Sequence, residues 1–169
     1  MKSAQEYINT IINKQKSYSL NLSNQDLTGE MNLSEFTNLT GISVDGNRFA
    51  NLDWLKTLPN KEKLKWLNLW NNEIERVDFV FLLDNFPNAK INLANNPLNG
   101  NTLKDLNDQQ FSLLVERIKN GSLKINSWKG AFLLDLLNYT SEIKRELFNF
   151  KQENIQDRLI AQQLQETNL

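Results

Sequence analysis

The sequence predicts an α/β solenoid, in which short units of a strand and a return segment stack in one direction. The main observation is an internal repeat of apolar residues followed by an Asn. The same spacing occurs in four stretches, with Gln in place of Asn in the first: residues 17–27, 39–49, 64–74 and 88–98. Successive stretches begin 22, 25 and 24 residues apart. Units of similar length and pattern are typical of stacked repeats that share one continuous core.

The best copy has apolar residues and Asn in the order LxxLxLxxNxL, at Leu64, Leu67, Leu69, Asn72 and Ile74. This pattern resembles the leucine-rich repeat family over residues 17–98, and its spacing resembles the short class with repeats of 22–25 residues. The resemblance implies a right-handed solenoid with parallel strands on the concave face and loose helical turns on the convex face. It implies little about function, because one scaffold serves many ligands.

A helical cap is expected at the N-terminal end, over residues 1–16. Ser3 and Glu6 fit a capping box, in which each side chain bonds the other residue's amide. Four apolar residues then recur at helical spacing and predict one buried face: Tyr7, Ile8, Ile11 and Ile12. This face should cover the end of the first unit.

Within the strands, alternate residues should point into the core. The predicted core pairs are Leu20 and Leu22, Ile42 and Val44, Leu67 and Leu69, and Ile91 and Leu93. Asn47, Asn72 and Asn96 should bond neighbouring backbone groups inside the turns, so we interpret them as structural. On the convex side, two apolar triplets share the same offsets: Leu52, Leu55 and Leu58, then Val77, Val80 and Leu83.

Residues 17–128 are expected to form the solenoid. Its last part should contain a helix over 108–119, with Asn107 as the N-cap and Gly121 at its end. A fifth, irregular strand is expected near 122–127, with Leu123 and Ile125 inward. Residues 129–169 should form a C-terminal helical cap and tail. The helix of the tail either docks on the preceding helix of this cap or protrudes from it.

The composition excludes several classes of site. The 169 residues contain no Cys and no His, which rules out disulfides, Cys/His zinc clusters and Ser-His-Asp triads. The acidic groupings at 73–78 and 105–108 lack the spacing of a calcium loop, and no glycine motif for phosphate occurs. We therefore predict that the protein is not an enzyme and has no catalytic residue, metal or cofactor.

Charge and hydropathy limit the classes of partner that the chain is expected to have. The chain has 19 basic and 20 acidic residues, a balance that argues against nucleic acid, although Lys61, Lys63 and Lys65 form a short basic run. No apolar run approaches the ~18 residues of a membrane span, and the first residues lack the apolar core of a signal peptide. We expect a cytoplasmic protein with no membrane partner. Secretion as an effector stays open as an alternative.

The family resemblance implies a partner site on the concave face. There Trp66 and Trp70 flank Asn68 on one strand, and exposed Trp is enriched among residues that dominate binding energy. Small neighbours, Gly41 and Ala94, should leave room beside the rings. The alternative is that the tryptophans only cover a neighbouring strand or helix. The predicted partner-binding residues are Trp66, Asn68, Trp70, Asn92, Asp45, Lys65 and Lys90. The other positions expected on this face are Tyr18, Ser19, Asn21, Ser23, Thr40, Ser43 and Ala89.

The predicted function is non-catalytic binding of a protein or peptide through the concave face, by a chain expected to be a monomer. Two alternatives stay open. The chain could be an assembly subunit whose C-terminal helices oligomerise or dock into a larger particle. It could also be an effector or a substrate-recognition subunit that acts with a separate enzyme.

Overall fold

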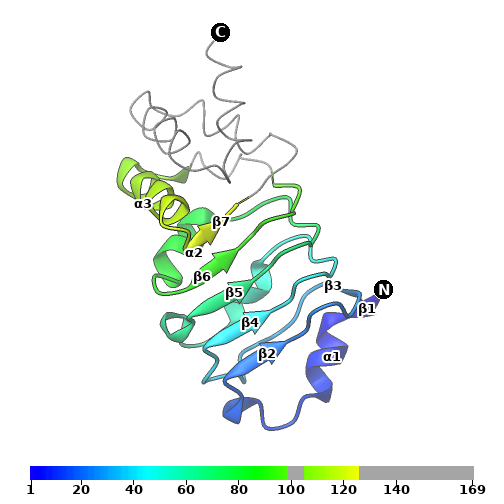
Figure 1. Cartoon of the computed structure of the whole chain (residues 1–169). Helices are drawn as coiled ribbons and strands as arrows, with labels where there is room; N and C mark the ends of the chain where they lie inside the picture. The colour runs from blue at the N-terminus through cyan, green and yellow to red at the C-terminus, as the bar shows by residue number, and fades with distance from the viewer. Residues whose placement is uncertain (99–104, 126–169) are drawn as a thin grey trace.

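The computed structural model of the protein describes residues 1–98 and 105–125. This part of the chain is mixed α/β, with three α-helices and a five-stranded parallel sheet. The strands of this sheet are β2 (Ser19–Asn21), β4 (Gly41–Ser43), β5 (Trp66–Asn68), β6 (Lys90–Asn92) and β7 (Leu123–Lys124). Their order in the sheet is their order in the chain, so each strand lies beside the next (Figure 1).

The five strands share one register. Their central apolar residues form a row across the sheet: Leu20, Ile42, Leu67, Ile91 and Leu123. Because side chains alternate along a strand, this row points into the core and its neighbours point away from it. The predicted core pairs are confirmed, since none of the eight residues is more than 4% exposed. The predicted fifth strand is confirmed too, with Leu123 and Ile125 both buried.

Short helices connect the strands. The 3₁₀ turn η1 (Lys14–Lys16) precedes β2, and η2 (Asp53–Thr57) and η3 (Lys61–Lys63) lie between β4 and β5. Between β5 and β6 lies a regular α-helix, α2 (Phe79–Asn85), which the Asp78 side chain caps by accepting from the Phe81 amide at 2.9 Å. The expected convex triplets are buried except Val80, which is only partly buried. An α-helix turns about 100° per residue, so residues spaced three apart do not all point to the same side of the helix. Val80 therefore lies at the edge of the buried face.

Helix α3 (Asp108–Lys119) follows the sequence prediction closely. Asn107 and Gln110 form a reciprocal capping box, and the helix ends at Asn120 before Gly121, whose φ is +77°. Its buried face is Phe111, Leu114, Val115 and Ile118, as predicted, together with Arg117. The helix packs against α2 and β7 at one end of the sheet (Figure 1).

The N-terminal cap differs from the prediction in its length. Helix α1 (Ala4–Thr10) begins after Ser3, whose hydroxyl accepts from the Glu6 amide at 3.3 Å, and ends because Ile11 is extended. Ala4 and Ile8 enter the core, but Ile12 lies beyond the helix and is 80% exposed, so its predicted burial was wrong. Before α1, strand β1 (Lys2–Ser3) pairs in parallel with β3 (Leu27–Thr28), a contact that the sequence pattern did not predict.

Buried asparagines join neighbouring turns, as predicted. The Asn96 side chain accepts from the amides of Asn72 and Ile74, at 3.2 and 3.1 Å, and donates to the carbonyls of Leu69 and Leu93, at 2.9 and 3.1 Å. Equivalent bonds surround Asn47 and Asn72. These bonds satisfy backbone groups that the core would otherwise bury without partners.

The predicted C-terminal cap and tail, residues 129–169, lie outside the described residues, and so does the question of whether the tail docks. Within residues 1–98 and 105–125, none of the helices combines the length and the apolar character needed to cross a membrane.

Candidate functional site

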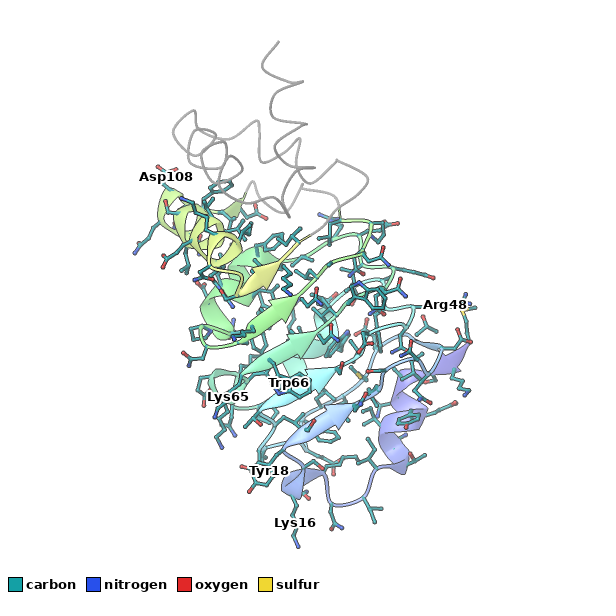
Figure 2. The ribbon with its side chains drawn as sticks, viewed as in Figure 1. Lys16, Tyr18, Arg48, Lys65, Trp66 and Asp108 are labelled. Carbon is teal, nitrogen blue, oxygen red and sulfur yellow. The ribbon has the colours of Figure 1, made fainter. Side chains whose placement is uncertain are left out.

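Six of the seven predicted partner-binding residues, all except Lys65, lie on the face of the five-stranded sheet that points away from the core. We call it the outer sheet face. It comprises the strand residues that alternate with the core row and the residues two positions after each strand: Ser19, Asn21, Ser23, Gly41, Ser43, Asp45, Trp66, Asn68, Trp70, Lys90, Asn92, Ala94 and Lys124. Figure 2 shows Trp66 near the middle of this face. Trp66 is 39% exposed and Trp70 is 42% exposed, so both rings meet solvent.

The indole of Trp66 lies against the neighbouring strand β4. A Cβ atom placed on Gly41 would be only 1.9 Å from Trp66 Cε2, so the ring occupies the space that a side chain at position 41 would need. We had expected Gly41 to leave room for an incoming side chain; that expectation was wrong, because Trp66 fills this room itself. The Trp66 side chain thus contacts β4 and also lines a pocket with residues of β6.

The pocket beside Trp66 has a volume of about 210 Å³. Its lining residues are Trp66, Leu67, Asn68, Lys90, Ile91, Asn92, Gly121 and Lys124. Four of the predicted binding residues are therefore brought together here: Trp66, Asn68, Lys90 and Asn92. Lys124 was not among the predicted binding residues, although the alternation of side chains along the fifth strand could have identified it. If Leu123 and Ile125 point inward, alternation places Lys124 on the outer sheet face.

The asparagines of this face have fixed side chains. Asn68 Oδ1 accepts from the Trp70 amide at 3.3 Å, and Asn92 Oδ1 accepts from the Ala94 amide at 3.1 Å. Such a bond to the amide two residues on is the local turn that Asn favours. Asn92 Nδ2 has no hydrogen-bond partner among the described residues, so it remains available as a donor at the pocket.

Asp45 is the centre of a polar cluster next to the pocket. Its Oδ1 atom accepts from the hydroxyls of Ser43 and Ser23, at 2.5 and 2.6 Å, and from Asn68 Nδ2 at 3.1 Å. Partial burial by itself would raise the pKa of Asp45, but the hydrogen bonds from Ser23 and Ser43 outweigh it, and the pKa lies below its ordinary value. The cluster thus holds a charged carboxylate in place and orients Asn68. It also buries Ser43, which is only 8% exposed.

Three other predicted positions lie outside the pocket. Trp70 and Lys65 are exposed but do not line the pocket. Ala89, which we expected on the surface, is 1% exposed and belongs to the core. Ala89 has the same position in the alternation as the inward Ile91 and Leu93. The buried guanidinium of Arg117 on α3 donates to the carbonyls of Ala89 and Phe86 and so ties the helix to this segment. Burial also lowers the pKa of Arg117.

A second, wider hollow of about 610 Å³ lies where the strands end. It is lined mainly by polar turn residues: Asn24, Asp26, Gly46, Asn47, Arg48, Asn71, Asn72 and Glu73. Two of its charges neutralise each other, because Arg48 and Asp26 form an ion pair at 2.8 Å. None of its lining residues is aromatic, so the pocket beside Trp66 is the stronger candidate for a binding site.

In the part of the chain that the structure describes, no cluster of three or more Asp and Glu side chains is placed to hold a metal ion. A scan against protein-family models and a search of curated proteins both gave no match to the chain.

Proposed function

We propose that the chain is a leucine-rich repeat solenoid that binds a protein or peptide partner through the outer sheet face, without catalysing a reaction. The observation that carries the proposal is the exposure of Trp66 on β5 and of Trp70 two residues after it, both on the face that points away from the core. The in-register strands and the bonded asparagines support the solenoid, because each unit contacts its neighbours in the same way.

Two half-exposed tryptophans only four residues apart favour partner binding over a role in which the rings merely cover a neighbouring strand. Trp66 covers Gly41, yet 39% of its surface stays in solvent, and Trp70 is more exposed still. Burial of apolar surface contributes about 25 cal/mol per Å², so removing both rings from water would contribute substantially to affinity. The Gly41 contact and the bonds of Asn68 hold the site rigid, which lowers the entropy cost of binding.

The one carboxylate of this face is poorly suited to acid–base chemistry. A general base works best with a pKa near the working pH. The pKa of Asp45 is lowered instead, so the group is fully ionised at neutral pH and is a weak base towards the serines that donate to it. We therefore interpret the Asp45 cluster as a structural support for Asn68 and the pocket.

The test is affinity capture from a lysate of the source cell, with the full chain immobilised. The informative variant combines Trp66→Ala with Trp70→Ala, and the matched control is Leu113→Ala, which removes a 40% exposed apolar side chain from α3. Circular dichroism must first show that both variants are folded. Partners held by the native chain and the control but lost with the double tryptophan variant would support the proposal. Partners retained by the double variant would refute it.

A further inference from the structure

We propose that the pocket beside Trp66 binds an acidic side chain, so that the partner presents an acidic peptide segment to the outer sheet face. This inference rests on the proposed binding function and adds the chemistry of the partner. It is carried by the lining of the pocket, which combines one aromatic wall, two lysines and an amide donor.

The charge of the pocket is positive and is not neutralised within the described chain. Lys90 stands beside Trp66 in the register of the sheet, and Lys124 stands beside Asn92 on the next strand. Both lysines are exposed, and neither forms an ion pair with any of the described residues. The nearest carboxylate on this face, Asp45, lies on the β4 side and is already held by two serines and Asn68. A carboxylate from the partner is thus the group that would neutralise the charge of the pocket.

The size of the pocket fits a side chain better than a free small molecule. Pockets for drug-sized ligands and cofactors hold about 300–1,000 Å³. This pocket holds about 210 Å³, room for one or two amino-acid side chains. Trp66 offers an apolar surface for a neighbouring residue of the peptide, while Asn92 Nδ2 and the two ammonium groups offer donors to a carboxylate.

The arrangement favours a peptide over a nucleic acid. Nucleic-acid binding depends on a row of cations that neutralises several phosphates. The outer sheet face has its two pocket lysines at one end, whereas Asp45 places a fixed negative charge nearer the other end, where it would repel a phosphate backbone running across the strands. The net charge of the chain is also −1.

The test uses a random-peptide library displayed on phage, selected against the immobilised full-length chain. The informative variant is Lys90→Glu with Lys124→Glu. Its matched control is Lys2→Glu with Lys16→Glu, which makes the same change in net charge at exposed residues outside the pocket; Figure 2 shows Lys16 beyond the opposite end of the sheet. The Trp66→Ala, Trp70→Ala variant is selected in parallel.

We expect the native chain and the control to enrich peptides with an Asp or Glu next to an apolar residue. The charge-reversed pocket should lose this acidic bias. In a selected peptide, exchange of the acidic residue for its amide should weaken binding to the native chain about ten-fold, as expected for a charged hydrogen bond.

Other results separate the two proposals. Peptides that need the tryptophans but show no acidic bias, or a bias that persists in the charge-reversed variant, would overturn the acidic-pocket inference and leave the binding function standing. Single-stranded oligonucleotides that displace the peptides and bind more tightly would also overturn it. Enrichment that is unchanged by loss of both tryptophans, or absent altogether, would count against the binding function as well.

Discussion

The Trp66 ring and the backbone of Gly41 are in direct contact across two neighbouring strands, and a Cβ at position 41 would lie 1.9 Å from Trp66 Cε2. Real side chains do not approach so closely, so no residue other than glycine fits at position 41 unless the ring moves. Gly41 therefore determines where one wall of the pocket stands, although it does not itself line the pocket.

The substitution Gly41→Ala should push the indole away from β4. We expect weaker peptide binding and a shift of Trp66 fluorescence to longer wavelength, because the displaced ring meets more water. Stability should change little, since the ring is already 39% exposed. The control is the same substitution in a Trp66→Ala background, where it should have no further effect on binding. Equal effects in both backgrounds would show that Gly41 acts by another route.

Asn96→Ala should strongly destabilise the fold. Asn96 is 1% exposed, and its side chain bonds two amides and three carbonyls at distances of 2.9 to 3.3 Å. Each buried polar group left unpaired costs about 1–3 kcal/mol, so urea unfolding should show a loss of at least about 2 kcal/mol. The control is Asn88→Ala, which removes an exposed side chain whose hydrogen bond to the Glu62 carbonyl is long, at 3.4 Å. Similar losses for the two variants would contradict a structural role for the buried asparagine.

The contribution of Asp45 should depend on pH. Its pKa is lower in the folded chain than its ordinary value of 3.8, so the unfolded chain binds this proton more readily. The carboxylate therefore stabilises the fold above about pH 3.8 and loses this contribution as the pH falls through the lower folded pKa. The difference in unfolding free energy between the native chain and Asp45→Asn should be constant near neutral pH and should shrink in acid. A difference that does not change with pH would refute this account.

The same carboxylate provides a direct test of its hydrogen bonds. Ser43→Ala removes the donor that lies 2.5 Å from Asp45 Oδ1, while burial continues to disfavour the charge. The pKa of Asp45, measured by NMR titration of its carboxyl carbon, should therefore rise. An unchanged pKa would mean that Ser43 does not stabilise the charged form.

Arg117 should fasten α3 to the rest of the domain. Its guanidinium donates to the carbonyls of Phe86 and Ala89 and to the Ser122 hydroxyl. Arg117→Met keeps much of the volume but leaves buried carbonyls without donors, so we expect a loss of about 2 kcal/mol or more in urea unfolding. Arg117→Lys should recover only part of it, because one ammonium lacks the planar fork of donors. Hydrogen exchange of the α3 amides should speed up in both variants, and unchanged exchange would contradict the assignment.

The periodic parts of the fold were predictable from the sequence. Alternation and the repeat length place Leu67 and Ile91 inward and in register, and the recurring Asn predicts the bonds seen at Asn96. These features depend on local pattern alone. The capping of α3 was predictable for the same reason, since Asn107 and Gln110 lie three residues apart.

Features that depend on contacts between distant residues were not predictable. Arg117 donates to the carbonyl of Ala89, 28 residues earlier, and no repeat pattern encodes that pair. Ile12 has helical spacing, but the chain turns extended at Ile11 and leaves it in solvent. The position of the Trp66 ring over Gly41 likewise depends on a side-chain orientation that spacing does not specify.

The central claim is that the partner contacts the outer sheet face, and site-specific photo-crosslinking in the full chain tests it most directly. A photoreactive benzoylphenylalanine replaces Lys65, which is exposed directly before β5 and next to Trp66, or Lys119, which is exposed at the end of α3, as the control. We predict that the partner crosslinks to position 65, that position 119 gives no adduct, and that Trp66→Ala with Trp70→Ala abolishes the adduct. Crosslinks from position 119 alone, or an adduct at position 65 that survives loss of both tryptophans, would contradict the claim.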